Sequence, residues 1–316
     1  MDLRISIEKT QDAALIHALT QAAFAEYGRE PGTSTALKET EEAIAAQFAE
    51  GMEALVVANL SPQPPPPGAH SSLGKGGPES DSPFPVRYER PGEGLGERLL
   101  LACVRYQIEG DALYFHRLSV HPGYRRQGLA KKLVGHLEAL ARAQGLVRLT
   151  CSVRLQKTDN VELYTSLGFQ LIGERSVCRD GTAVATGDFE KKLPKMTVQE
   201  AMLEQHYLEL PRLTHCELDK LWYSCWYDGP MTGMLRWLDK RYWYHFLDAE
   251  GKGETEDDWY RHAGIVLLSE EEIAYEDYWQ EQFETRKPND KYESRSYLDH
   301  PIIAWFDIFE KVVESQ

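Results

Sequence analysis

One stretch of the sequence decides the fold: Leu118-Ser119-Val120-His121-Pro122-Gly123-Tyr124-Arg125-Arg126-Gln127-Gly128-Leu129-Ala130-Lys131. It follows an alternating, strand-like segment and opens a segment whose leucines recur on one stripe of a helix. A helix N-terminus offers backbone N–H groups without a helical partner and the positive end of the helix dipole, so this turn can bind a phosphate group. Arg125 and Arg126 add positive charge, and Gly128 lets an anion approach the backbone. A basic helix start with a packing glycine also fits this pattern.

The elements around this stretch are predicted in the order β-α-α-β-β-β-α-β-α-β-β. We expect strands over residues 3–8, 53–59, 99–109, 111–120 and 146–153, and two more between 169 and 192. Helices are expected after Asp12, over 34–50, from Gly128 to Gly145 and over 160–167. Residues 61–97, rich in Pro, Gly and Ser, are predicted to be a flexible insertion between two strands or a proline segment for a partner.

The composition changes along the chain. Residues 196–316 contain 26 acidic and 12 basic side chains and all seven tryptophans, whereas the rest of the chain is almost neutral. Two compositions in 316 residues predict two domains, 1–195 and 196–316. Because neither part is basic, free nucleic acid is not expected as a partner.

The sequence also favours a cytoplasmic protein without membrane spans or disulfides. It has no run of about 18 apolar residues, and no apolar segment resembling a secretory signal follows Met1. Its five cysteines are irregularly spaced, as expected of reduced thiols. We expect no metal site, since His215, Cys216 and Cys225 fit no ordinary zinc spacing.

Three motifs in register resemble those of the GNAT superfamily of N-acetyltransferases. Arg125-Arg126-Gln127-Gly128-Leu129-Ala130 matches the family's pyrophosphate motif, Gln/Arg-x-x-Gly-x-Gly/Ala, at its fixed positions. Leu118-Ser119-Val120-His121-Pro122 resembles the strand end Leu-Ala-Val-x-Pro, and residues 160–169 resemble the second signature, with Asn160, Tyr164 and Leu167-Gly168-Phe169. The resemblance covers about residues 3–193. It implies an α/β (α+β) GNAT fold, with a mixed, mostly antiparallel central sheet and flanking helices, and transfer of an acetyl group from acetyl-CoA to a primary amine of a small molecule or protein.

The resemblance also implies roles for individual residues. The backbone of Leu118, Ser119 and Val120 would bind the pantetheine arm at a splayed β-bulge, and Asn160 would contact pantetheine or orient the last helix. Tyr164 would protonate the departing CoA thiolate, which is sensible because a phenol can supply a proton as charge develops on sulfur. The pyrophosphate would be held by the backbone amides of Arg125, Arg126, Gln127, Gly128, Leu129, Ala130 and Lys131.

The general base is less clearly indicated. Many members of the family place a glutamate on the strand before the turn, but the aligned residue here is Tyr114. His116 lies two residues on, on the same strand face, and could accept the proton directly or through water; a water chain or a purely structural histidine are the alternatives. The acceptor could be attracted by Glu26, Glu30, Glu39, Glu41 and Glu42, although a solvated helix face explains these carboxylates equally well.

Residues 196–316 carry no recognised signature and are predicted to form a small, Trp/Tyr-rich α+β domain. We expect a hairpin over 232–247, a helix over 269–283 with a capping box of Ser269 and Glu272, and a final helix through Ile302, Phe306, Phe309 and Val313. The aromatics could form a dense core or line a ligand groove or a protein interface. Two rival functions stay open: a non-catalytic acyl-CoA-binding regulator that acts on a protein partner through this domain, and an interaction protein whose activity resides in this domain alone.

Overall fold

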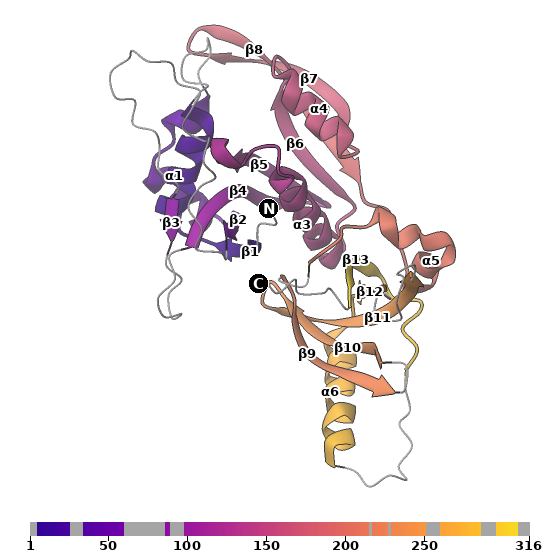
Figure 1. The fold of residues 1–316 in the computed structure, drawn as a ribbon. Coiled ribbons are helices and arrows are strands. Elements are labelled where there is room, and N and C mark those ends of the chain that lie inside the picture. Colours follow the sequence, from indigo (N-terminus) through magenta and orange to yellow (C-terminus); the bar gives the residue numbers. More distant parts are fainter. Residues whose placement is uncertain are drawn as a thin grey trace. The chain divides into compact units, whose positions relative to one another are not determined.

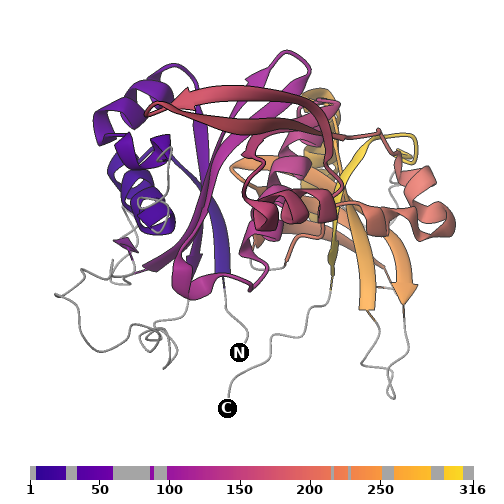
Figure 2. The ribbon, with the colours of Figure 1, turned by 90° about the horizontal axis from the view of Figure 1, so that it is seen from above.

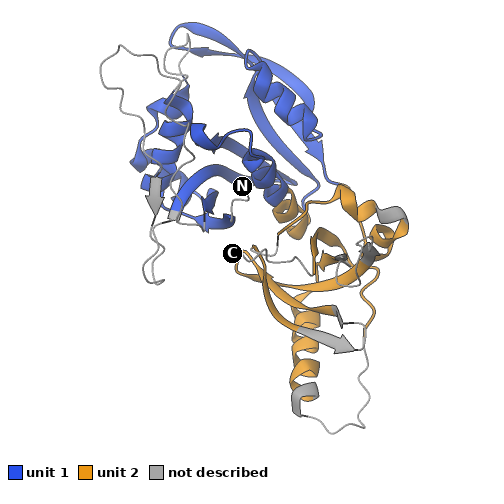
Figure 3. Ribbon diagram, in the orientation of Figure 1, with its two compact units in different colours: residues 1–137, 146–193 blue, residues 138–145, 194–316 orange. Residues whose placement is uncertain are grey.

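The computed structural model describes residues 5–25, 34–59, 86–88, 98–214, 217–226, 229–250, 260–285 and 295–308. The chain forms two compact units, shown in Figure 3: residues 1–137 with 146–193, and residues 138–145 with 194–316. We call them unit 1 and unit 2.

Unit 1 is built on a mixed sheet in the strand order β1-β2-β4-β5-β6-β8-β7 (Figure 1). Its only parallel pair among the described strands is β5 with β6. The predicted mixed, mostly antiparallel sheet with flanking helices is therefore confirmed. The strands are β1 (Ile5–Thr10), β2 (Glu53–Asn59), β4 (Arg98–Glu109), β5 (Ala112–Val120), β6 (Arg148–Arg154), β7 (Gln170–Arg179) and β8 (Thr182–Lys192), and β3 (Val86–Tyr88) pairs with β4.

The helices of unit 1 begin where their caps place them. Asp12 caps α1 (Ala13–Phe24) by accepting a hydrogen bond from Leu15 N at 3.0 Å, as predicted. The single helical stretch expected over 34–50 is instead two elements, the 3₁₀ helix η2 (Thr35–Lys38) and α2 (Glu41–Ala49). The break occurs because Glu39 is extended (φ −69°, ψ 145°) and Thr40 then caps the second helix. The other helices are α3 (Leu129–Ala143) and α4 (Thr158–Ser166).

The core of unit 1 forms where α1 and α2 cover β2 and β4. Leu15, Ile16 and Leu19 of α1 pack with Ile44 and Phe48 of α2 against apolar side chains of the two strands. Of the insertion predicted over 61–97, only β3 lies among the described residues, so the expected flexibility of the rest lies outside them.

The hairpin β7–β8 reaches across unit 1 toward the first helices (Figure 2). Its turn, Asp180-Gly181, has two positive φ angles, 50° and 75°, as in a tight two-residue hairpin turn. At this tip, Lys38 of η2 donates a hydrogen bond to Asp180. The tip of the hairpin therefore contacts η2, the element that follows α1 in the chain.

Unit 2 contains a five-stranded antiparallel sheet in the order β13-β12-β11-β10-β9. The predicted hairpin is confirmed as β10 with β11, and the predicted helix is α6, where Ser269 and Glu272 form the expected capping box. The elements are α5 (Val198–Met202), the 3₁₀ helix η4 (Leu203–Glu209), β9 (Asp219–Trp226), β10 (Gly229–Trp237), β11 (Lys240–Glu250), β12 (Tyr260–Val266), α6 (Glu270–Thr285) and β13 (Ile302–Asp307).

The predicted final helix is wrong. Residues 302–307 form strand β13, which pairs with β12, and every one of its side chains is buried. A short apolar run that is buried on both faces cannot be told from a helix by periodicity alone, and here Ile302 and Ile303 favour the strand. Phe309 and Val313, which completed the helical spacing, lie outside the described residues.

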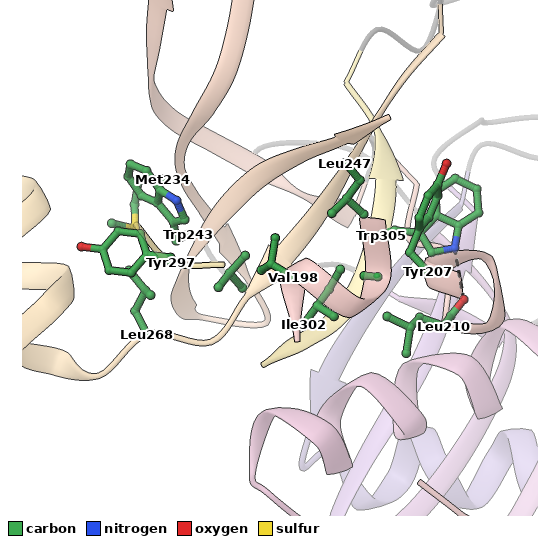
Figure 4. Packing of buried hydrophobic residues seen from close by; sticks show 12 residues of the cluster. Val198, Tyr207, Leu210, Met234, Trp243, Leu247, Leu268, Tyr297, Ile302 and Trp305 are labelled. Carbon is green, nitrogen blue, oxygen red and sulfur yellow. Dashed lines mark hydrogen bonds between the residues drawn. The ribbon is translucent and has the colours of Figure 1, made fainter. Parts of the chain in front are cut away.

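The aromatic residues of unit 2 form its core (Figure 4). Trp243 packs edge-to-face against Trp222 and Tyr297, with ring centroids 5.5 and 5.7 Å apart, an arrangement typical of aromatic cores. Trp305 donates its indole N–H to the Leu210 carbonyl at 3.1 Å. For the aromatics of this cluster, the structure therefore favours the dense core over an exposed groove.

A polar network crosses the buried end of this sheet. His262 Nε2 lies 3.1 Å from Asp307 Oδ1, and its Nδ1 lies 2.6 Å from the Tyr207 hydroxyl. Arg212 also donates to Asp307. Burial raises the pKa of Asp307, but the hydrogen bonds and charges of His262 and Arg212 outweigh it and lower the pKa.

Candidate functional site

The central strands β5 and β6 separate at the site. They pair only from Ala112–Arg148 to Tyr114–Thr150, and the remainder of β5 does not pair with β6 in the described register. Next to this fork, β5 has a bulge: His116 and Ser119 oppose Arg105 and Cys103, and Arg117 has a φ of 54°. The backbone at residues 118–120 therefore runs along an opened strand edge, where it can bond a ligand.

The basic turn after β5 leads into α3. Arg126 and Gly128 have φ angles of 61° and 79°, and the first bond across the helix start is donated by Lys132 N to Gly128 O at 2.9 Å. The amides of residues 129–131 precede this bond, as at the N-terminus of any helix. A Cβ at Gly128 would contact nothing within 4 Å, so the glycine is required here by its φ rather than by lack of space.

The two arginines of this turn differ in their surroundings. Arg125 is half-buried and donates from Nη2 to the Ala23 carbonyl at 2.8 Å, which ties the turn to the end of α1. Arg126, Gln127 and Lys131 are exposed. Arg125 therefore has a structural contact, and the exposed cations are better placed to meet an anion.

A pocket of about 320 Å³ lies beside the fork. Five of the predicted site residues line it: Tyr114, His116, Leu118, Asn160 and Tyr164. The other predicted residues, Ser119, Val120 and 125–131, belong to the strand end and the turn and do not line it. The sequence-predicted residues thus form two groups, one lining the pocket and one in the turn before α3, and the end of β5 connects them.

Tyr164 is held on α4 by aromatic packing. Its ring contacts Phe115, Phe169 and Phe189, with centroids 5.7 to 6.4 Å away. Burial raises the pKa of Tyr164 well above that of an ordinary phenol, with smaller contributions from Cys151 and Tyr114. The phenol therefore stays protonated at any ordinary pH and can act as a proton donor.

His116 is a weak base in this setting. Its ring stacks on Tyr114 at 5.8 Å, and its Nε2 lies 3.2 Å from the sulfur of Met52. Burial, aided by the positive charges of Arg105 and Arg117, lowers the pKa of His116 to about 3. The imidazole is therefore neutral near pH 7, but its affinity for a proton is low.

The pocket is lined by five cations that the sequence analysis did not select: Arg117, Arg154, Lys157, Arg175 and Arg179. No carboxylate is among the described residues lining it. Burial lowers the pKa of Arg179, and the positive charges of three neighbours, Arg154, Arg117 and Arg175, lower it further. A period-two signal was available, since Arg175, Val177 and Arg179 alternate along one strand and all face the pocket.

The carboxylates expected to attract the acceptor are placed differently. Glu39 bridges Arg105 and Arg117, at 2.6 and 3.1 Å, and does not line the pocket. Glu41 lies 3.7 Å from His17 and is exposed, as is Glu42. Glu26 and Glu30 lie outside the described residues. The described carboxylates thus serve structure or face solvent.

No described helix is long and apolar enough to cross a membrane. No group of three or more His, Cys, Asp or Glu side chains that could hold a metal ion occurs among the described residues.

No curated protein matches the chain. It is similar to solved structures of the ribosomal-protein-S18-alanine N-acetyltransferase from Escherichia coli (18% identity, 60% of this chain and 94% of that chain, TM-score 0.40) and an acetyltransferase of the GNAT family from Streptococcus pneumoniae (14%, 60% and 100%, TM-score 0.40). It is also similar to an N-acetyltransferase from Thermoplasma acidophilum in complex with coenzyme A (13%, 59% and 98%, TM-score 0.37).

The family comparison covers the fork, the turn and α4. Residues 68–169 match the model of the acetyltransferase (GNAT) family.

Proposed function

We propose that residues 1–195 are an acetyl-CoA-dependent N-acetyltransferase that acetylates a primary amine of a small molecule or protein. One observation carries the proposal: a buried, protonated Tyr164 and the opened end of β5 border the same pocket. The match of residues 68–169 to an acetyltransferase family supports it. Residues 196–316 are proposed as an accessory domain for the choice of substrate or partner.

Acetyl-CoA would bind along the fork. The backbone of residues 118–120 is proposed to bond the pantetheine arm, because this part of β5 has lost its pairing with β6. The amides of 125–131, with the exposed Arg126 and Lys131, would bind the pyrophosphate at the start of α3. Asn160, which lines the pocket at the start of α4, would contact pantetheine.

The chemistry is a direct transfer in a ternary complex. The amine nitrogen attacks the thioester carbonyl, the C–N bond forms, and the C–S bond breaks. Tyr164 donates its proton to the departing thiolate and is reprotonated from solvent. The nitrogen loses a proton to water. Tyr164 begins each cycle protonated, as a general acid must, and because burial raises its pKa it releases the proton only as negative charge develops on the sulfur.

The acceptor amine can lose its proton in this pocket without a strong base. His116 and Tyr114 line the pocket and can relay a proton through water, but the lowered pKa of His116 makes it a weak acceptor. The cations around the pocket disfavour a charged ammonium and thereby lower the pKa of a bound amine. A larger share of the acceptor is then present as the reactive free amine.

The alternative is a non-catalytic acyl-CoA-binding regulator that acts on a protein partner through residues 196–316. It requires the same CoA site but no role for Tyr164. A cytoplasmic location and the absence of nucleic-acid and membrane partners stay predictions.

The test replaces Tyr164→Phe, with Tyr278→Phe on the exposed surface of α6 as the matched control. Acetyl-CoA affinity is measured by calorimetry, and thiol release is measured with a panel of amines. We expect kcat to fall about 100-fold or more in Tyr164→Phe, with acetyl-CoA affinity within about twofold of wild type. Tyr278→Phe should change neither. Unchanged turnover in Tyr164→Phe would refute the assigned role, and binding of acetyl-CoA without transfer to any amine would favour the regulator.

A further inference from the structure

The acceptor side of the pocket is built from three strands whose residues lie in register. Arg154 of β6 pairs with Thr186 of β8, which in turn pairs with Arg175 of β7. All three side chains line the pocket. Because directly paired residues of adjacent strands point to the same face of a sheet, the two guanidinium groups flank the threonine hydroxyl.

Thr186 has an unused hydrogen-bonding group at the centre of this row. The residue is only 4% exposed, and its Oγ1 has no hydrogen-bond partner among the described residues. Buried hydroxyls are nearly always bonded, so an unbonded one that faces a pocket indicates a missing ligand. A hydroxyl between two guanidinium groups donates well to an anion.

The positive charge of the pocket also favours a bound anion. Arg117 and Arg175 have carboxylate partners, Glu39 at 3.1 Å and Asp188 at 3.1 Å. Burial lowers the pKa of Arg179, on the same face of β7, and repulsion by Arg154, Arg117 and Arg175 lowers it further. This repulsion would be relieved by an anion bound among them.

We propose that the pocket selects an amine acceptor that carries a carboxylate, bound by Arg154, Thr186 and Arg175, with Arg179 as a further cation. Guanidinium groups suit carboxylates because their planar forks can donate two parallel hydrogen bonds. The site does not compete with the proposed pyrophosphate site, since none of residues 125–131 lines this pocket. The proposal rests on the proposed acetyltransferase function for its amine, but the anion site stands on its own geometry.

The first experiment compares acceptors of nearly equal size and different charge. Calorimetry measures the binding of L-glutamate, of L-glutamine amide (in which both carboxylates are replaced by amides) and of spermidine without acetyl-CoA, and acetyl transfer is measured with each. We expect glutamate to bind about tenfold or more tightly than the diamide, with spermidine the weakest ligand. A preference for spermidine would overturn the proposal.

Variants distinguish a loss of acceptor binding from a loss of stability. Thr186→Val keeps the shape of the side chain and removes a hydroxyl that has no described partner, so the variant should be as stable as wild type. It should nevertheless raise the KM or Kd for glutamate about tenfold. Arg175→Gln should do the same, because Arg175 is exposed enough to be replaced without unfolding. Arg148→Gln is the control. It is the same kind of change at the first residue of β6, and Arg148 does not line the pocket.

The two proposals fail in different ways. Glutamate that binds in a manner dependent on Thr186 and Arg175, without acetyl transfer to any amine, would support the anion site and refute the acetyltransferase. Acetylation of L-glutamine amide and spermidine, with both bound at least as tightly as glutamate and unaffected by Thr186→Val, would refute the anion site and leave the acetyltransferase.

Discussion

Replacing Glu39→Gln should destabilise unit 1 strongly, because Glu39 balances a buried charge. Arg105 is fully buried, and its Nη2 donates to Glu39 Oε2 at 2.6 Å. Arg117 donates to both carboxylate oxygens, at 3.1 and 3.3 Å. A glutamine keeps one acceptor oxygen but turns an NH₂ group toward a guanidinium group, so at least one hydrogen bond and the whole counter-charge are lost.

The magnitude follows from the cost of breaking a buried ion pair. Removing one partner of such a pair costs about 3–5 kcal/mol. The lower end applies here, because Gln47 still accepts from Arg105 Nη1 at 2.7 Å. We therefore expect the free energy of unfolding to fall by about 3 kcal/mol, or the Tm to fall by about 6–12 °C for a unit of this size.

The assay is urea unfolding followed by circular dichroism, with Glu41→Gln as the control. Glu41 makes an exposed contact with His17, so its replacement should change stability by no more than about 0.5 kcal/mol. Tryptophan fluorescence, which reports on residues 196–316 alone, gives an internal reference. Equal stability of the two variants would show that Arg105 does not depend on Glu39 and would refute the reasoning.

The pH dependence of stability is a second test of the contacts between Glu39 and the two arginines. Burial raises the pKa of Glu39, but the hydrogen bonds and charges of Arg117 and Arg105 outweigh it and lower the pKa. Because the folded-state pKa lies below the unfolded one, the contribution is complete above the unfolded pKa and is lost as the pH falls through the folded one. The difference between wild type and Glu39→Gln should therefore shrink in acid.

Three further variants test other parts of the structure. Asp307→Asn should destabilise unit 2 by about 2 kcal/mol, measured by fluorescence in urea, with the loss disappearing in acid because the pKa of Asp307 is lowered in the fold. Gly264→Ala should cost about 1–3 kcal/mol in the same assay, because its Cβ would lie 2.2 Å from the buried Ile302. Gly128→Ala should cost about 1 kcal/mol through its φ of 79° and should weaken acetyl-CoA binding in calorimetry.

Each of these predictions has a control or a contrary result. Gly173→Ala adds a Cβ with nothing within 4 Å and should leave stability unchanged. Gly181→Ala carries similar backbone strain, at a φ of 75° in the hairpin turn, and should not affect acetyl-CoA binding. If Gly181→Ala weakens binding as much as Gly128→Ala, strain alone is the cause and the turn is not a phosphate site. An Asp307→Asn variant that stays as stable as wild type would show that its network contributes little.

These elements of unit 1 could be predicted because a cap, a turn or an apolar stripe marks each of them in the sequence. Asp12 begins α1, the turn Asp180-Gly181 divides β7 from β8, and the leucine stripe defines α3. The motif-bearing residues of the pocket, such as Tyr164 and Asn160, were found because a family pattern marks them. Arg175 and Arg179 were missed because arginines on a hairpin resemble any solvated strand face until β8 pairs with β6 and brings them beside the pocket.

Where prediction failed, neighbours far along the chain decided the outcome. Residues 302–307 have a helical spacing of apolar side chains, but they pair with β12 as the edge strand of the unit 2 sheet. The carboxylate Glu39 looked available on a helix face, yet Arg105 and Arg117, which follow it by 66 and 78 residues, hold it. Sequence periodicity carries no information about such partners.

The alternation of β7 has a practical consequence for following the hairpin in solution. Cys178 lies between Val177 and Arg179, so its side chain points away from the pocket that they line, and it is exposed. Cys103 and Cys151 are buried, and burial raises the pKa of both thiols, which slows their alkylation. Of Cys103, Cys151 and Cys178, the last is therefore the one that a maleimide dye should label, which places a reporter on the back of the arginine-bearing strand without obstructing its front.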